Sequence, residues 1–178
     1  MTTEPDFAAL LDDGAFNLPS DWPPKEWVPV ARDRVGDIGA VTCLQRVTAH
    51  SFFSMTTVYT RQDDRWIDAF ENGEQWPEAP TSARPGAGRP FALLTGTSGA
   101  AVGTEPTNVA FTAGVVTSQV RRLRVISRRD EHDVCIDNRT GIFVALSLHW
   151  PDSTMFRLAA FDGNGEELDH IDYRDPWS

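Results

Sequence analysis

The sequence predicts a mainly β protein, built as an antiparallel β-sandwich with a short N-terminal helix. From residue 39 onward, short segments rich in Val, Thr and aromatic residues alternate apolar and polar side chains. Turn signals separate these segments about every 8–12 residues, as expected for a sandwich or barrel, of which we predict the sandwich. After residue 12 no long helical period appears, which argues against alternating strands and helices.

The N-terminal region predicts one helix and then irregular chain. Phe7, Leu10 and Leu11 share one face of a helix over residues 5–12, "PDFAALLD". Residues 18–31, "LPSDWPPKEWVPVA", contain four prolines. Because proline lacks an amide donor and fixes φ, we expect extended, irregular chain that leads into an edge strand.

The first predicted strands follow in order. Residues 39–49, "GAVTCLQRVTA", and 52–60, "FFSMTTVYT", alternate with period two. Residues 61–65, "RQDDR", are a turn, and 65–70, "RWIDAF", are a strand or a single helical turn. Residues 71–90 are too polar and too rich in Gly and Pro for a strand, which predicts a linker or large loop.

This break suggests a division of the chain. We expect an N-terminal β-rich segment or subdomain over residues 1–80, a linker or loop over 81–90, and a β-sandwich domain over 91–178. One continuous fold is the alternative.

Strand signals recur at short spacing in the C-terminal half. The predicted strands are 91–97, 108–116, 118–127, 133–136, 141–148, 154–161 and 166–172. The intervening stretches, including 99–107, "GAAVGTEPT", are predicted turns.

Three segments within residues 108–172 carry a resemblance at the level of fold. They are "AGVVTSQVRRLRV", "RTGIFVALSL" and "RLAAFDGNGEEL", and together they resemble immunoglobulin-like or fibronectin-like sandwich modules of bacterial proteins. The Trp and Tyr spacings of an antibody-type core are missing around Cys43 and Cys135. The resemblance implies an architecture and no activity.

Charge and composition exclude several classes of function. The 178 residues include 16 Lys+Arg and 26 Asp+Glu, a formal net charge of −10, which disfavours binding to nucleic acid and to anionic lipid. No stretch approaches a membrane span, and the first residues lack the pattern of a signal peptide. We therefore expect a cytoplasmic protein in which Cys43 and Cys135 are free thiols.

The stretch "FDGNGEE" invites comparison with a calcium loop. Counting from Asp162, the required glycine at position 6 is Glu167 and the required glutamate at position 12 is Tyr173. Asp-Gly and Asn-Gly are also strong hairpin signals. The stretch therefore predicts a β-hairpin between two strands.

Other candidate catalytic and metal-binding motifs are incomplete. Ser98 in "TGTSGAA" partly matches a nucleophile elbow, with His149 or His170 as its base, but a loop joining strands is the preferred interpretation. His132 and Cys135 are spaced as two zinc ligands would be, yet no second pair accompanies them. We expect Cys135 to face a core, and we predict neither a metal nor another cofactor.

The remaining candidates indicate binding. Five arginines lie in "VRRLRVISRR", residues 120–129, where alternation places Arg122 and Arg124 on one face. They either pair with acidic residues of this chain or form an acidic-partner patch. Six tryptophans lie mostly outside the predicted strands, and Trp22, Trp27 and Trp76 are candidate partner-binding residues.

The leading hypothesis for function is a non-enzymatic acidic protein that binds a protein partner or itself, of the accessory, inhibitor or immunity type. A small-ligand or carbohydrate-binding module that uses loop tryptophans is the second hypothesis. A serine hydrolase is the third.

Overall fold

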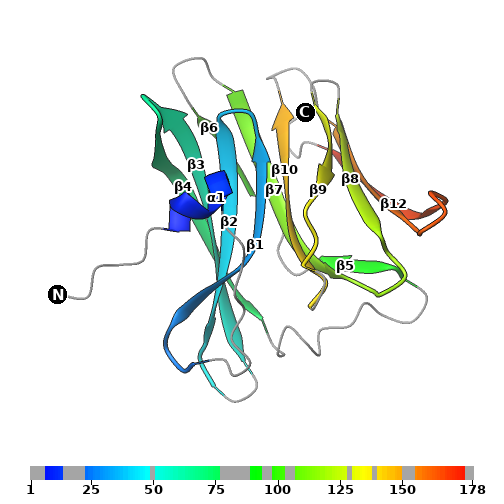
Figure 1. Cartoon of the computed structure of the whole chain (residues 1–178), viewed down its shortest axis with the longest axis horizontal. Coiled ribbons are helices and arrows are strands. Elements are labelled where there is room, and N and C mark those ends of the chain that lie inside the picture. The colour runs from blue at the N-terminus through cyan, green and yellow to red at the C-terminus, as the bar shows by residue number, and fades with distance from the viewer. Residues whose placement is uncertain are drawn as a thin grey trace.

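The structure, a computed structural model, describes residues 7–13, 23–48, 51–76, 89–93, 98–102, 107–127, 130–137, 140–149 and 155–174. A short helical segment, η1 (Phe7–Ala9) followed by α1 (Leu10–Asp13), precedes the strands. Within the described residues the strands form three antiparallel sheets of four strands each, which we call sheets A, B and C (Figure 1). The predicted β-sandwich architecture with a short N-terminal helix is confirmed.

Sheet A contains the first four strands in sequence order. They are β1 (Trp27–Val35), β2 (Ile38–Arg46), β3 (Phe52–Gln62) and β4 (Arg65–Trp76). The proline-rich segment leads into an edge strand, as expected, because β1 pairs only with β2 in this sheet. The register of β1 shifts between Pro29 and Ala31, where the missing amide donor of proline is tolerated.

Sheet B has the strand order β10-β7-β5, and β6 also pairs with β7. Its strands are β5 (Phe91–Leu93), β6 (Ser98–Val102), β7 (Thr107–Val116) and β10 (Ile142–His149). Sheet C has the order β12-β11-β8-β9. Its strands are β8 (Arg122–Ser127), β9 (Glu131–Val134), β11 (Met155–Phe161) and β12 (Glu167–Arg174).

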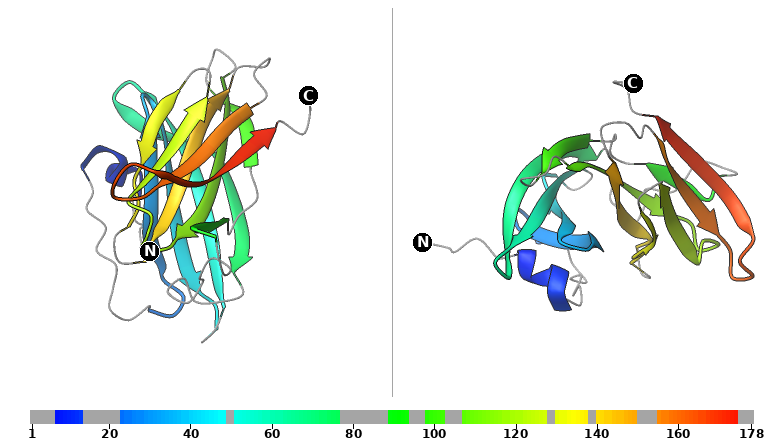
Figure 2. Two further views of the ribbon diagram at one scale, coloured as in Figure 1. Left: turned by 90° about the vertical axis from the view of Figure 1, so that its right-hand side faces the viewer. Right: turned by 90° about the horizontal axis from the view of Figure 1, so that it is seen from above.

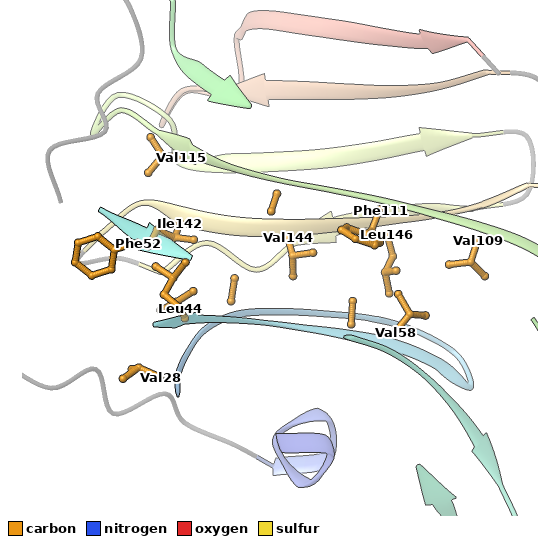
Figure 3. Packing of buried hydrophobic residues seen from close by; sticks show 14 residues of the cluster. Val28, Leu44, Phe52, Val58, Val109, Phe111, Val115, Ile142, Val144 and Leu146 are labelled. Atoms are coloured by element: carbon orange, nitrogen blue, oxygen red, sulfur yellow. The ribbon is translucent and has the colours of Figure 1, made fainter. Parts of the chain in front are cut away.

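Sheet B is the middle layer, with sheet A on one face and sheet C on the other (Figure 2). Phe111 and Leu146 belong to the core cluster shared with sheet A (Figure 3), whereas Ala110 and Phe143 belong to the cluster shared with sheet C. Successive residues of a strand face opposite sides, so burial of both faces explains the nearly continuous apolar sequences of β7 and β10.

Several local predictions are wrong, and the strand predicted over residues 118–127 begins only at Arg122. β4 continues to Trp76, through residues that were predicted to be too polar for a strand. Most of its described side chains are exposed, so polar residues are tolerated, and pairing with β3 extends the strand. Residues 99–102 belong to β6 where a turn was expected over 99–107, since they gain a partner in β7. β9 begins at Glu131, and Cys135 follows the strand and is exposed instead of facing a core.

The predicted domain boundary falls mostly on residues 77–88, which lie outside the described residues. The core cluster between sheets A and B draws Leu44 and Val58 from one side of that boundary and Phe111 and Leu146 from the other. The division into domains stays a prediction.

Candidate functional site

A buried ionic cluster lies where the three sheets meet. Asp33 of β1 is 5% exposed, and its Oδ2 is 2.8 Å from Nε2 of His132 in β9. The same oxygen accepts a hydrogen bond of 2.8 Å from the backbone N–H of Leu146 in β10. On the other side of the ring, Nδ1 of His132 is 3.1 Å from Oδ1 of Asp130 and 3.0 Å from Oδ2. The cluster therefore connects one strand of each sheet.

The two carboxylates determine the charge of this histidine. Burial alone lowers the pKa of His132, but hydrogen bonds and charge from Asp130 and Asp33 outweigh burial and raise it to about 10. The ring is a cation at neutral pH, with both nitrogens directed to carboxylates. A general base needs a free nitrogen and a pKa near the working pH, so this arrangement suits a structural ion cluster better than proton transfer.

The outer face of sheet A, opposite sheet B, is divided into two parts. The short helix lies over one part, which we call the covered half: Gly39, Val41, Cys43, Tyr59 and Trp66. The other part, which we call the open half, follows from strand alternation and register: Trp27, Gln45, Phe53, Met55 and Gln75. Trp27 lies at the boundary of the two parts, because it also packs against the cluster under the helix. Figure 3 shows the helix on the opposite side of sheet A from the main core.

An aromatic pair dominates the open half. The rings of Trp27 and Phe53 are 6.0 Å apart between centroids and meet edge to face at 68°. Both side chains are half-buried, and Met55 beside them is half-buried too. Phe53 lies across Gly73 of β4, where an added Cβ would be 2.7 Å from the ring. Glycine at this position therefore lets the phenylalanine lie flat on the sheet.

The structure separates the predicted partner-binding residues. Trp27 lies on β1 of sheet A, and Trp76 ends β4 at the opposite edge of that sheet. Trp22 lies outside the described residues. Arg122 and Arg124 lie on β8 of sheet C, which packs against the far side of sheet B. Trp27 and the two arginines therefore do not form one surface.

The arginines of β8 have partners within the chain. Arg124 is bound by two carboxylates of β9, with its Nε 2.7 Å from Asp133 Oδ1 and its Nη1 2.8 Å from Glu131 Oε1. The Arg122 guanidinium lies 4.5 Å from the centroid of the Phe161 ring. These contacts agree with the interpretation in which the arginines pair within the chain, while their role toward a partner stays a prediction.

The remaining motifs are also placed. The predicted hairpin at Asp162 is confirmed: its Oδ1 accepts backbone hydrogen bonds from Asn164 at 2.8 Å and Glu166 at 2.9 Å, which lower its pKa. Ser98 opens β6, and His149 ends β10.

Both cysteines are free thiols, Cys43 buried and Cys135 exposed. Within the described ranges, no three His, Cys, Asp or Glu side chains are grouped as metal ligands would be.

Sequence reasoning missed Asp33 and Phe53. An aspartate at an inward position of an alternating strand is a signal for a buried ionic partner, and "VARDRV" carries that signal. Phe53 was predicted to lie in a strand but was given no role. Its position beside Trp27 depends on the pairing register of β1, β2 and β3, which the sequence does not show.

Comparisons with protein-family models, curated proteins and solved structures find no match to this chain. Among the described residues, no helix has the length and apolar character needed to span a membrane.

Proposed function

We propose that this chain is a non-enzymatic binding protein, of the accessory, inhibitor or immunity type, which holds a protein partner against the open half of sheet A. The observation that carries the proposal is the half-buried Trp27–Phe53 pair on the outer surface of sheet A. Aromatic residues are enriched at protein interfaces, and tryptophan is among the residues that contribute most to binding there. The chain's acidity favours a partner with a basic rim.

A carbohydrate ligand is the second candidate. Gln45 and Gln75 lie in the same cross-strand row as Trp27 and Phe53, so amide groups accompany the aromatic rings. However, two rings that meet edge to face do not offer one flat platform to a sugar. A sugar-dependent change in tryptophan fluorescence that disappears in Trp27→Phe would favour this alternative.

Affinity capture from the native cytosol tests the protein-partner proposal. Tagged wild-type chain is compared with Trp27→Ala/Phe53→Ala and with Phe161→Ala, a control on sheet C that also disturbs the ring under Arg122. We expect a specific partner that the first variant loses and the control keeps. A partner lost only with Phe161→Ala would move the surface to sheet C. Failure of all forms to retain a partner would contradict the proposal.

Two finer assignments belong to the same proposal. Sheets B and C, which pack face to face, are proposed as an immunoglobulin-like or fibronectin-like pair, and an experimental structure with another strand order would contradict this. The cytoplasm is the proposed location, and recovery in a secreted or membrane fraction would contradict it.

A further inference from the structure

Residues 7–13 form a short helical segment that lies on the covered half of sheet A. η1 lies against β4, and α1 lies against β1 and β2, so the segment runs across the strands. Ala8 and Leu11 are its buried side chains, packed with Val41, Cys43 and Tyr59. A helix this short is unstable alone in water, so its conformation depends on the surface beneath it.

A notch in the sheet receives Leu11. A Cβ added at Gly39 of β2 would be 2.5 Å from Leu11 Cδ1 and 2.7 Å from Cδ2. Glycine at this position therefore leaves the space that one branched apolar side chain fills. The covered half selects such a side chain by shape.

Arginines of β1 bind the end of the helix. Nη1 of Arg34 donates to the carbonyl of Leu11 at 3.4 Å, and Nη1 of Arg32 donates to the carbonyl of Leu10. The last carbonyls of a helix have no partner within it, so a guanidinium can satisfy them whatever the side chains are. The two guanidinium groups therefore hold the end of this helix through its backbone.

The third feature is a receptor for one carboxylate. Oδ1 of Asp12 is 3.0 Å from Nη1 of Arg34 and 3.7 Å from Nη1 of Arg61. Its Oδ2 accepts a hydrogen bond of 3.0 Å from Nε1 of Trp66. Both guanidinium groups also lie over the Trp66 ring, 5.1 and 5.7 Å from its centroid. An acidic residue directly after the notch-filling residue completes the recognition pattern.

We propose that the covered half is a docking site for the C-terminal turn of a partner helix that carries a branched apolar residue followed by an acidic one, and that residues 7–13 occupy it until such a helix displaces them. The biological role of this site rests on the proposed function in protein binding. Buried Leu11 and Ala8, the partly buried Phe7 and Leu10, and half-exposed ion pairs hold the segment. These contacts are few beside those of the main cores, so the segment opens at lower free energy than the whole fold.

The probe is a fluorescein-labelled, acetylated peptide of residues 3–13, "TEPDFAALLDD". The receptor is the full chain with Leu11→Ser and Asp12→Ser, which we call the released chain. We expect it to bind the peptide at least about tenfold more tightly than the wild-type chain does, because the wild-type segment competes at high effective concentration. Fluorescence anisotropy gives both affinities.

Charge reversal provides the specificity control. Arg34→Glu in the released chain should weaken binding about tenfold, and a peptide with Asp12→Arg should regain affinity for that variant alone. Gly39→Val should block binding by filling the notch. Arg157→Glu, on the far sheet C, is the matched control and should leave the affinity unchanged.

The buried thiol of Cys43 reports on occupancy of the site independently. In a Cys135→Ser background, release of the segment should accelerate modification of Cys43 by a thiol reagent, and the peptide should slow it again. A folded released chain that neither binds the peptide nor protects Cys43 would overturn the proposal. Concentration-dependent dimers that the peptide fails to dissociate would also overturn it, in favour of a second copy as the occupant.

A second experiment applies if the released chain does not fold, as judged by loss of its far-UV circular dichroism signal. The wild-type chain with a protease site inserted after residue 14 is folded, cut and mixed with the labelled peptide. Exchange of the peptide for the cut segment supports the proposal, and absence of exchange overturns it. If the peptide does not exchange but affinity capture still finds a partner that depends on Trp27 and Phe53, the docking site is wrong and the proposed function stands.

Discussion

At the scale of single residues, the buried ion cluster ties the stability of the fold to pH. The pKa of His132 is 6.5 in its ordinary state and about 10 in the folded protein. Below about 6.5 the ring is charged in both the folded and the unfolded chain, and the stabilisation is fully present. Between these two values only the folded protein keeps the proton, so the stabilisation decreases as pH rises and is lost above about 10.

We therefore expect the melting temperature of the wild-type protein to fall between about pH 7 and pH 10 more steeply than that of His132→Gln. Differential scanning calorimetry across this range measures the difference. His170→Gln is the control, because His170 is exposed and paired with Glu167 on the surface. Parallel pH profiles for the wild-type protein and His132→Gln would show that Asp33 and Asp130 do not hold the ring as a cation.

Asp33 is expected to be the costlier residue of the cluster to remove. Asp33→Ala leaves the Leu146 N–H and the His132 cation without their buried acceptor, which should lower the free energy of unfolding by roughly 3–5 kcal/mol. In the double variant with His132→Leu, the loss should be smaller than the sum of the two single losses, because the unpaired cation is gone. Urea denaturation measures all four proteins, and additive losses would contradict the coupling.

The cluster also marks a limit of prediction from sequence at this scale. Asp33 binds His132 and Leu146, which are 99 and 113 positions away. Alternation within "VARDRV" shows that an acid faces inward but not which residue meets it. By contrast, the Asp162 turn was predictable, because all of its hydrogen bonds lie within four positions.

At the scale of elements, alternation in the sequence predicted most of the strands and failed where the sequence of a strand does not alternate. On β8, alternation placed Arg122 and Arg124 on one face and Leu123 and Val125 on the other, and the structure buries the second pair. The sequences of the last residues of β4 and of β6 do not alternate between apolar and polar residues, so only pairing with a neighbour reveals these strands. The open half was likewise beyond prediction, because strand register brings Phe53 to Trp27.

Strand β5 is held by a close approach that only glycine permits. A Cβ added at Gly114 of β7 would lie 2.4 Å from the carbonyl oxygen of Ala92 and 2.7 Å from the Phe143 ring. Gly114→Ala should therefore separate β5 from β7 and cost about 2 kcal/mol or more. Hydrogen exchange of the amides of β5 and urea denaturation measure both effects. Gly163→Ala, in an open turn, is the matched control and should be nearly neutral, and equal behaviour of the two variants would contradict this account.

At the scale of the whole molecule, the middle sheet couples the outer two. β7 and β10 contribute one face to the cluster shared with sheet A and the other face to the cluster shared with sheet C. Loss of either outer sheet would expose an apolar face of sheet B to water, which is unfavourable in proportion to the area exposed. Neither outer sheet should therefore unfold while the other stays intact.

This coupling predicts one cooperative unfolding transition for the chain. Leu44→Ala in the first cluster and Leu123→Ala in the second remove fully buried side chains, and each should cost about 2–5 kcal/mol. Both variants should move the same single calorimetric peak to lower temperature, by roughly 2–4 °C per kcal/mol for a chain of this size. Two peaks, each shifted by only one of the variants, would instead divide the chain near residues 81–90, because sheet A would then unfold independently of sheets B and C.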